Sequence, residues 1–120
     1  MADYRKLRVW DRSTKLAVTV FKIAGKARKA GHVKLADQME GSSESIASNI
    51  AEGSGFDSRK QFSRYLTYSI ASSCEIESQL KLAYGLHLIE WKQKDALDKE
   101  IEAVRKMLTR LRKRMDGDTT

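Results

Sequence analysis

Apolar residues recur every three or four positions along most of this chain, in four segments separated by short polar or glycine-containing stretches. This spacing places apolar side chains on one face of an α-helix. The first two segments run from about Tyr4 to Lys29 and from about Val33 to Glu52. The third extends from Ser58 to Gly85, and the fourth from Trp91 to Met115. The pattern therefore predicts an all-α chain of four helices.

Each predicted helix has an apolar or small-residue face that is expected to point inward. In the first two helices this face comprises Leu7, Trp10, Ala17, Phe21 and Ala24, and then Leu35, Met39, Ser42, Ile46 and Asn49. In the third it comprises Phe62, Leu66, Ser69, Ser73, Ile76, Leu80 and Ala83. In the fourth it comprises Leu97, Ile101, Val104, Leu108, Leu111 and Met115.

Glycine and serine mark the expected helix ends. Gly31 can end the first helix. Gly53 and Gly55 are expected to stop the second, since glycine reaches the left-handed conformation that closes a helix C-terminus. The hydroxyl of Ser58 can cap the third helix while Gln61, three residues on, reaches back as a capping box.

Four helices joined by short connections favour an antiparallel up-and-down bundle. The chain has 120 residues, which is enough for one domain. We expect the bundle to span residues 1–115 and the polar residues 116–120 to form a disordered tail. In this topology the first and fourth helices are neighbours.

Positive charge concentrates in the first and last segments of the chain. The formal net charge is +7, with nine Lys or Arg against two acids over residues 1–30, five against eight over 31–90, and nine against six over 91–120. A basic surface attracts phosphate backbones or acidic proteins, although a solvated helix surface has the same composition. The candidate nucleic-acid-binding residues are Arg5, Lys6, Arg8, Arg12 and Lys15 in the first helix and Arg105, Lys106, Arg110, Arg112, Lys113 and Arg114 in the fourth.

The second and third helices contain many small or polar residues on their expected inward faces. Their serines can let the two backbones approach closely and bond the carbonyl four residues back, which we favour over a serine nucleophile. Asn49 lies on the apolar face, where a structural role at the Gly53 turn or in helix register is favoured over a ligand contact. Glu52, Glu75 and Glu77 can gather at one end or seam of the bundle, where ion pairs or a subunit contact are favoured over acid–base chemistry.

The aromatic residues exceed what one small core needs. Phe62 and Leu66 already occupy the inward face of the third helix, so Tyr65 and Tyr68 are expected to point partly outward. Amphipathic aromatics on an outer helix face are typical of subunit interfaces, with base stacking as the alternative. We therefore expect a homo-oligomer.

The sequence contains no recognisable catalytic or metal-binding constellation. The histidines, His32 and His87, lie near expected helix ends, and neither follows a glutamate by three positions as in a di-iron bundle. The single cysteine, Cys74, offers neither an intrachain disulfide nor a metal pair. No stretch approaches the roughly 18 apolar residues of a membrane span, and the N-terminus lacks the apolar run of a signal peptide. We therefore expect a non-enzymatic, cytoplasmic protein without cofactor, metal or membrane contact.

Several motifs in the chain match a known family. They are Leu7-x-Val9-Trp10, Gln38, Ser45-Ile46-x-Ser48-Asn49-Ile50-Ala51-Glu52-Gly53-x-Gly55, Phe62-x-Arg64-Tyr65-Leu66 and Ser72-x-x-Glu75-x-Glu77-x-Gln79-Leu80, followed by Ala83, Leu86 and Ile89. Over this stretch the chain resembles the S23-like four-helix bundle family encoded by intervening sequences of bacterial 23S rRNA genes. The resemblance implies a ring-like homopentamer of antiparallel bundles and no enzymatic activity. It also implies relatives that serve as accessory proteins of diversity-generating retroelements, where a basic pentamer binds nucleic acid and a reverse transcriptase.

The chain departs from the family pattern around its second helix. Glu40 and Gly41 stand where the family often has two arginines, and Ser42 and Ser43 replace an apolar pair. Phe56 replaces a common arginine after the second turn glycine. If those arginines contact RNA or a neighbouring subunit in relatives, the contact is lost or inverted here.

Two functions are compatible with these features. The leading hypothesis is an oligomeric bundle that binds structured nucleic acid, RNA in particular, through phosphate contacts of low specificity and steep salt dependence. Charge reversal at Arg110, Arg112 and Arg114 is then expected to weaken binding of all sequences alike. The alternative is an adaptor or scaffold that docks a protein partner, with the charge serving solubility and steering.

Overall fold

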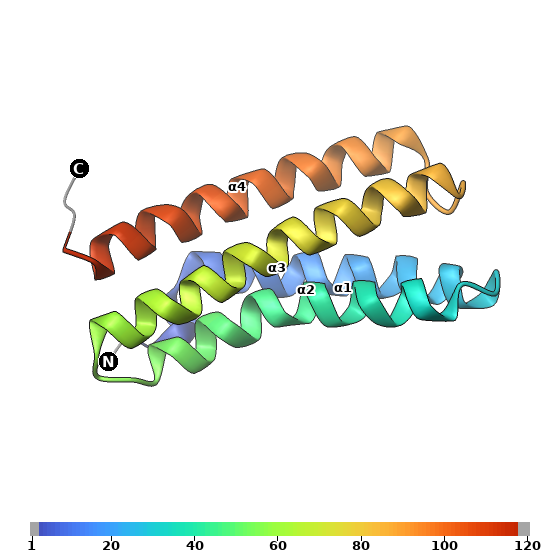
Figure 1. The fold of residues 1–120 in the computed structure, drawn as a ribbon. Helices are drawn as coiled ribbons and strands as arrows, with labels where there is room; N and C mark the ends of the chain where they lie inside the picture. Colours follow the sequence, from blue (N-terminus) through green and yellow to red (C-terminus); the bar gives the residue numbers. More distant parts are fainter. Residues whose placement is uncertain (1–2, 118–120) are drawn as a thin grey trace.

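The computed structural model describes residues 3–117 and contains four long helices. Helix α1 spans Arg8–Lys29, α2 spans Val33–Ser54, α3 spans Arg59–Gly85 and α4 spans Trp91–Met115, and a 3₁₀ turn, η1, covers Tyr4–Lys6. Figure 1 shows the helices lying lengthwise, each running antiparallel to the one before it. The expected all-α, antiparallel up-and-down four-helix bundle is confirmed. The predicted tail lies partly outside the described residues, and Asp116 is the C-cap residue of α4.

The core lies between the four helices and follows their length. All seven residues expected inside on α3 are buried, and so are the residues expected on α4 except Met115, which is half-buried. On α2 the prediction fails only at Asn49, which is half-buried, while Ile50 occupies the core. The periodicity of these three helices therefore located the core directly.

Helix α1 differs from the prediction in its start and in its inward face. It begins at Arg8, because Leu7 is extended and Asp3 caps the separate turn η1. Two apolar rows run along this helix, and the predicted row, which contains Phe21, lies at the edge of the core, where Phe21 is 41% exposed. The buried row is Val9, Ser13, Leu16, Val20, Ile23 and Ala27, together with Ala24 from the predicted row.

The loops at one end of the bundle close α1 and α3 in the same way. Gly31 has a φ of 93°, and the amide of His32 donates to the carbonyl of Ala27 at 2.8 Å. After α3, His87 takes the left-handed position with a φ of 62°, and the amide of Leu88 donates to the carbonyl of Ala83 at 3.0 Å. These are Schellman motifs, which satisfy carbonyls left free at a helix end.

The α2–α3 turn corrects the role predicted for its glycines. Helix α2 continues through Gly53 to Ser54, and Gly55 has a right-handed helical φ of −75°, so neither glycine is left-handed. Gly53 instead allows α2 to lie close to α3, since a Cβ at this position would lie 2.6 Å from the Cβ of Tyr65. The predicted Ser58 cap of α3 is confirmed, because the backbone amide of Gln61 donates to the Ser58 hydroxyl at 3.2 Å. The second half of the predicted capping box, a bond from the Gln61 side chain back to Ser58, is not found among residues 3–117.

The serines of α2 and α3 join the two helices. The buried Ser69 hydroxyl donates to the carbonyl of Ile46 at 2.8 Å, and the hydroxyls of Ser45 and Ser72 share a hydrogen bond. The sequence predicted bonds to the carbonyl four residues back, but Ser43 and Ser73 instead donate to the carbonyl three residues back, at 3.2 and 2.6 Å. The hydroxyls use their hydrogen-bonding capacity within the bundle, which favours the packing role over a nucleophilic one.

Candidate nucleic-acid interface

Helices α1 and α4 are neighbours, joined by a bidentate ion pair at their seam. The Arg12 guanidinium donates to the two carboxylate oxygens of Glu100 at 2.5 and 3.0 Å. These hydrogen bonds raise the pKa of Arg12, which is fully charged at any physiological pH. The predicted adjacency of the first and fourth helices is thus confirmed, and their basic surfaces merge.

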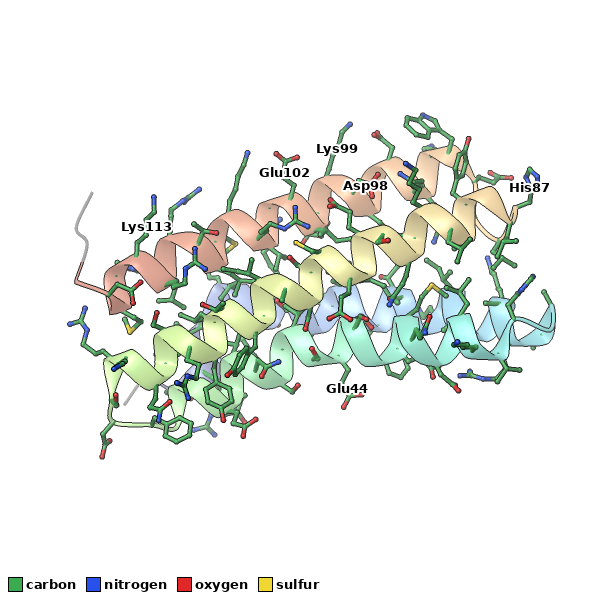
Figure 2. The ribbon with its side chains drawn as sticks, viewed as in Figure 1. Glu44, His87, Asp98, Lys99, Glu102 and Lys113 are labelled. Carbon is green, nitrogen blue, oxygen red and sulfur yellow. The ribbon has the colours of Figure 1, made fainter. Side chains whose placement is uncertain are left out.

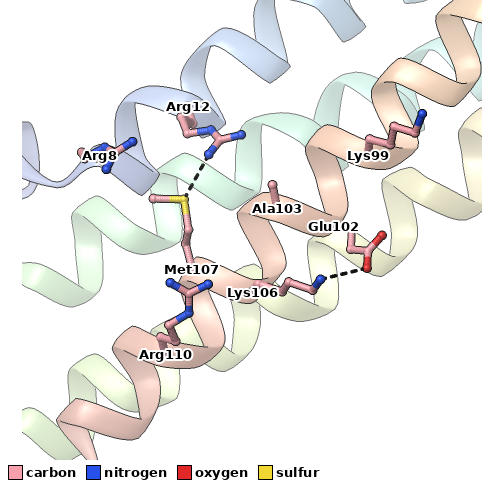
Figure 3. Close-up of a pocket in the computed structure, with 8 residues that line it drawn as sticks. All are labelled: Arg8, Arg12, Lys99, Glu102, Ala103, Lys106, Met107 and Arg110. Atoms are coloured by element: carbon pink, nitrogen blue, oxygen red, sulfur yellow. Dashed lines mark hydrogen bonds and ion pairs between the residues drawn. The ribbon is translucent and has the colours of Figure 1, made fainter.

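A groove of about 410 Å³ runs along this seam (Figure 3). Two arginines of α1 and six residues of α4 line it: Arg8, Arg12, Lys99, Glu102, Ala103, Lys106, Met107 and Arg110. Five of these eight residues are Lys or Arg, against one carboxylate. The groove lining is therefore net positive, and its low-dielectric walls strengthen the field inside it.

The cations of the groove differ in how freely they can meet a ligand. Lys106 pairs with Glu102 at 3.2 Å, and Lys99 pairs with Asp95 at 2.9 Å. Arg12 is held by Glu100, as described above. Arg8 and Arg110 are both exposed, and neither has an ion-pair partner among residues 3–117. The unpaired charge of the groove is therefore on Arg8 and Arg110, one on each wall.

The remaining predicted cations of α1 and η1 lie outside the groove. Arg5 pairs with Asp3 at 3.0 Å, which lowers the pKa of that carboxyl through the Arg5 hydrogen bond. Lys15 pairs with Asp11 at 2.9 Å and Lys6 is exposed. These side chains extend the basic surface without lining its groove.

The remaining predicted cations of α4 divide between two faces. Lys113 projects outward from α4 in Figure 2, and Arg114 is exposed. Arg105 instead faces α3, where it donates to the Ser73 hydroxyl at 2.9 Å and to Glu77 at 3.2 Å. Arg112, seven residues later on the same side of the helix, is half-buried. The structure therefore gathers Arg8, Arg12, Lys106 and Arg110 at the groove and separates Arg105 and Arg112 from them.

One cation of the groove, Lys99, was missed by the sequence prediction, as were the lining residues Glu102, Ala103 and Met107. Lys99 precedes Lys106 by seven positions, so both side chains lie on one face of α4. This spacing was available in the sequence. The prediction was confined to cations between residues 105 and 114, a stretch without acidic residues near the end of the helix, which left Lys99 out.

The outer face of α2 and α3 has the opposite character. Residues 41–51 and 65–80 contain no Lys or Arg and only three acids, Glu44, Glu75 and Glu77. A second groove of about 360 Å³ lies on this face, lined by Gln38, Gly41, Ser42, Ser45, Glu75 and Gln79. The side-chain oxygen of Gln79 is buried there and has no hydrogen-bond partner within the described part of the chain. We call this surface the α2–α3 face.

The predicted acidic cluster does not form. Glu75 lines the groove of the α2–α3 face, whereas Glu77 pairs with Arg105 on the side facing α4. Their positions two residues apart place them on different sides of the helix. Glu52 is exposed near the end of α2. The ion-pair role that the sequence favoured is confirmed for Glu77 alone.

The other residues expected to be structural or at a subunit contact lie near the α2–α3 turn. Asn49 donates through its side-chain amide to the carbonyl of Ser45 at 2.8 Å, which is a contact within α2. Tyr65 is half-buried and stacks on Phe56 with ring centroids 5.4 Å apart. Tyr68 is 46% exposed and contacts Tyr65 edge-on. The tyrosines therefore point partly outward, as predicted.

Glu40 and Gly41, which stand where the resembled family often has two arginines, lie on α2. Glu40 accepts hydrogen bonds from Arg28 of α1 at 2.7 and 3.1 Å, and Arg28 also bonds Asp37 at 2.9 Å. A Cβ at Gly41 would meet nothing within 4 Å. At the first position an arginine would face Arg28, so the glutamate here holds the α1–α2 hairpin together.

Neither a metal cluster nor a membrane helix is found in the described residues. Residues 3–117 hold no group of three or more His, Cys, Asp or Glu side chains placed to bind a metal ion. None of the four helices combines the length and the apolar character needed to cross a bilayer.

His87 lies in the α3–α4 loop, at the opposite end of the bundle from Lys113 (Figure 2).

Comparisons with known proteins agree with this architecture. The family model described as 23S rRNA-intervening sequence protein matches residues 5–110. A solved structure of a protein of unknown function, from the S23 ribosomal protein family of Bacteroides thetaiotaomicron, has 24% sequence identity to this chain and a TM-score of 0.81. The match covers 88% of this chain and 95% of that one, which shows a shared fold. No curated protein matches the chain.

Proposed function

Because the chain belongs to the 23S rRNA-intervening sequence protein family, we propose that it binds structured nucleic acid, RNA in particular, without catalysing a reaction. The observation that carries the proposal is the groove between α1 and α4, with unpaired Arg8 and Arg110 on its two walls. Arginine and lysine bind nucleic acid by neutralising phosphates and releasing condensed counterions. The outward Lys113 and Arg114 extend this surface towards the end of α4.

Such a surface is expected to bind with low specificity. Phosphate contacts position a protein on nucleic acid but carry no sequence information. Three of the groove's cations are already held by Glu100, Asp95 or Glu102, so a phosphate must compete with these carboxylates. Affinity is therefore expected to be moderate and strongly dependent on salt.

The test is fluorescence anisotropy with a labelled structured rRNA fragment and an unrelated duplex, each titrated at about 50 and about 200 mM salt. For about five phosphate contacts, the affinity for both should fall roughly 500-fold between these conditions. Much tighter binding to the rRNA fragment that survives salt would instead indicate specific recognition. Absence of binding to either RNA at low salt would overturn the proposal.

We further propose that the chain forms a homo-oligomer, the pentamer implied by the family resemblance, through the α2–α3 face. Interface centres are depleted in charged residues and enriched in tyrosine. The α2–α3 face combines this composition with the exposed Tyr68 and with the groove lined by Ser45, Glu75 and Gln79.

Sedimentation velocity of the purified chain tests the assembly. The wild-type protein should sediment as a species whose mass is about five times the chain mass of 13.6 kDa. Tyr68→Lys should shift it towards the monomer, because it places a charge in the interface. Val18→Lys is the matched control, since Val18 is 53% exposed on α1, away from this face. A wild-type protein that sediments as a monomer at micromolar concentration would contradict the proposal.

Docking of a separate protein is the alternative proposal for the basic surface. The positive charge would then steer an acidic partner rather than hold phosphate. This alternative gains support if the wild-type protein binds no nucleic acid at low salt. The cytoplasmic location stays a prediction, and a reverse transcriptase is a partner that the family resemblance implies for relatives.

A further inference from the structure

The α1–α4 groove differs from a flat basic surface because apolar side chains lie between its two rows of cations. Ala103 and Met107 are half-buried residues of α4 within the lining. Figure 3 shows Met107 between Arg12 on one wall and Arg110 on the other. The Arg12 guanidinium also donates to the Met107 sulfur at 3.6 Å, which holds both side chains in place. A ligand that fits here must combine negative charge with an apolar surface.

Resting on the nucleic-acid binding proposed above, we propose that this groove takes a single-stranded segment of RNA rather than a duplex. Its volume of about 410 Å³ lies near the lower end of the roughly 300–1,000 Å³ typical of small-ligand pockets. A site of this size suits a ligand of about one nucleotide. A double helix is far wider and can only lie across the rims of the groove.

The position of the cations supports a single strand. The Arg12 side chain lines the groove and is 35% exposed, so a phosphate that lies in the groove can contact it. In a duplex the phosphates are on a convex outer surface and the base faces are stacked inside. A single strand exposes its bases, so one chain can place phosphates against both walls and a base against the apolar strip.

The apolar strip gives the base a suitable partner. Methionine sulfur makes favourable contacts with aromatic rings, and every nucleobase has an aromatic face. Proteins that bind single strands combine a basic groove along the backbone with side chains that pack against bases. The groove has both parts, although thioether packing here replaces the usual aromatic stacking.

Ala103→Phe tests this assignment because it fills the groove without changing any charge. Ala96→Phe is the matched control, since Ala96 lies seven residues earlier on the same face of α4 and is exposed outside the groove lining. We expect Ala103→Phe to weaken binding of a labelled 12-nucleotide oligoadenylate about tenfold or more, and Ala96→Phe to leave it unchanged. A 12-base-pair RNA duplex should bind both variants like the wild type.

A second variant guards against a folding defect in the first. Met107→Gln keeps the length of the side chain and removes its apolar contact. It should therefore weaken binding of the single strand several-fold and leave binding of the duplex unchanged. Circular dichroism melting shows whether each variant is folded. Met107→Gln alone decides the proposal if Ala103→Phe unfolds.

Each other outcome overturns the assignment. If the oligoadenylate binds Ala103→Phe and Met107→Gln as tightly as it binds the wild type, it does not bind in the groove. The proposal that the basic surface binds phosphates is then retained. The same holds if the duplex loses as much affinity as the single strand. If polyglutamate competes and its binding is lost in Ala103→Phe, the groove belongs to acidic peptides. If the wild type binds neither RNA at low salt, the proposed function fails as well.

Discussion

Replacing Arg8 and Arg110 together by glutamate should weaken nucleic-acid binding about a hundredfold at near-physiological salt. Each arginine is exposed on one wall of the α1–α4 groove, and neither is engaged by a carboxylate within residues 3–117. A hydrogen bond to a charged group contributes roughly 1.5 kcal/mol or more, and two lost contacts therefore correspond to about two orders of magnitude. Anisotropy titrations at several salt concentrations measure the affinity and the slope of its logarithm against the logarithm of salt concentration. The magnitude of this slope should decrease by about two.

The matched control is the double variant Lys60→Glu and Lys81→Glu. Both lysines are exposed on α3, away from the groove, and the change in net charge is the same. If the two double variants lose affinity equally, the chain responds to its net charge and the groove has no special role. Reversal of Arg112 should have a smaller effect than reversal of Arg110, because Arg112 is half-buried outside the groove.

Gly53→Ala should lower the free energy of unfolding by about 1–3 kcal/mol, the usual range for overpacking a core. The added Cβ would lie 2.6 Å from the Cβ of Tyr65 and 3.1 Å from the ring of Phe62. The Tyr65 Cβ is tied to the backbone of α3, so the contact is relieved only if α2 and α3 move apart. That movement would loosen the helix pair near its turn. Urea denaturation followed by circular dichroism gives the change in stability.

Gly25→Ala is the control for the helical glycine itself. A Cβ at Gly25 meets nothing within 4 Å, and the residue lies inside α1. Alanine is a better helix former than glycine, so this variant should gain about 0.5–1 kcal/mol. Equal stabilisation of Gly53→Ala and Gly25→Ala would show that the close approach at Tyr65 is tolerated and that Gly53 has no packing role.

The sequence predicted the fold well because each of three helices, α2, α3 and α4, has a single apolar face that can point inward. On α3 the stripe from Phe62 to Ala83 alternates with polar residues, and on α4 the stripe from Leu97 to Leu111 does the same. Ser58 was identified as a cap from its position alone. Helix α1 was harder because it has two apolar rows, and periodicity cannot rank them. Packing against α2 and α4 decides which row is buried.

The candidate site was predicted only in outline. Charge counting located a basic surface on the first and last helices, and bundle topology placed them together. Charge counting does not show which cation is already paired, so Arg105 was grouped with Arg110 although it bonds Ser73 and Glu77. Lys99 was overlooked because it lies among acidic residues in the sequence, although its spacing of seven residues places it on the same helix face as Lys106.

By itself, the sequence determined the four helices, their antiparallel order and the basic character of the first and last, since these follow from local periodicity, short connections and composition. Only the tertiary structure decided what depends on distances between helices. These include the groove between α1 and α4, its apolar strip, the two arginines left unpaired on its walls and the contact that requires Gly53. Such distances arise when side chains from separate segments pack together, and no spacing within one segment records them.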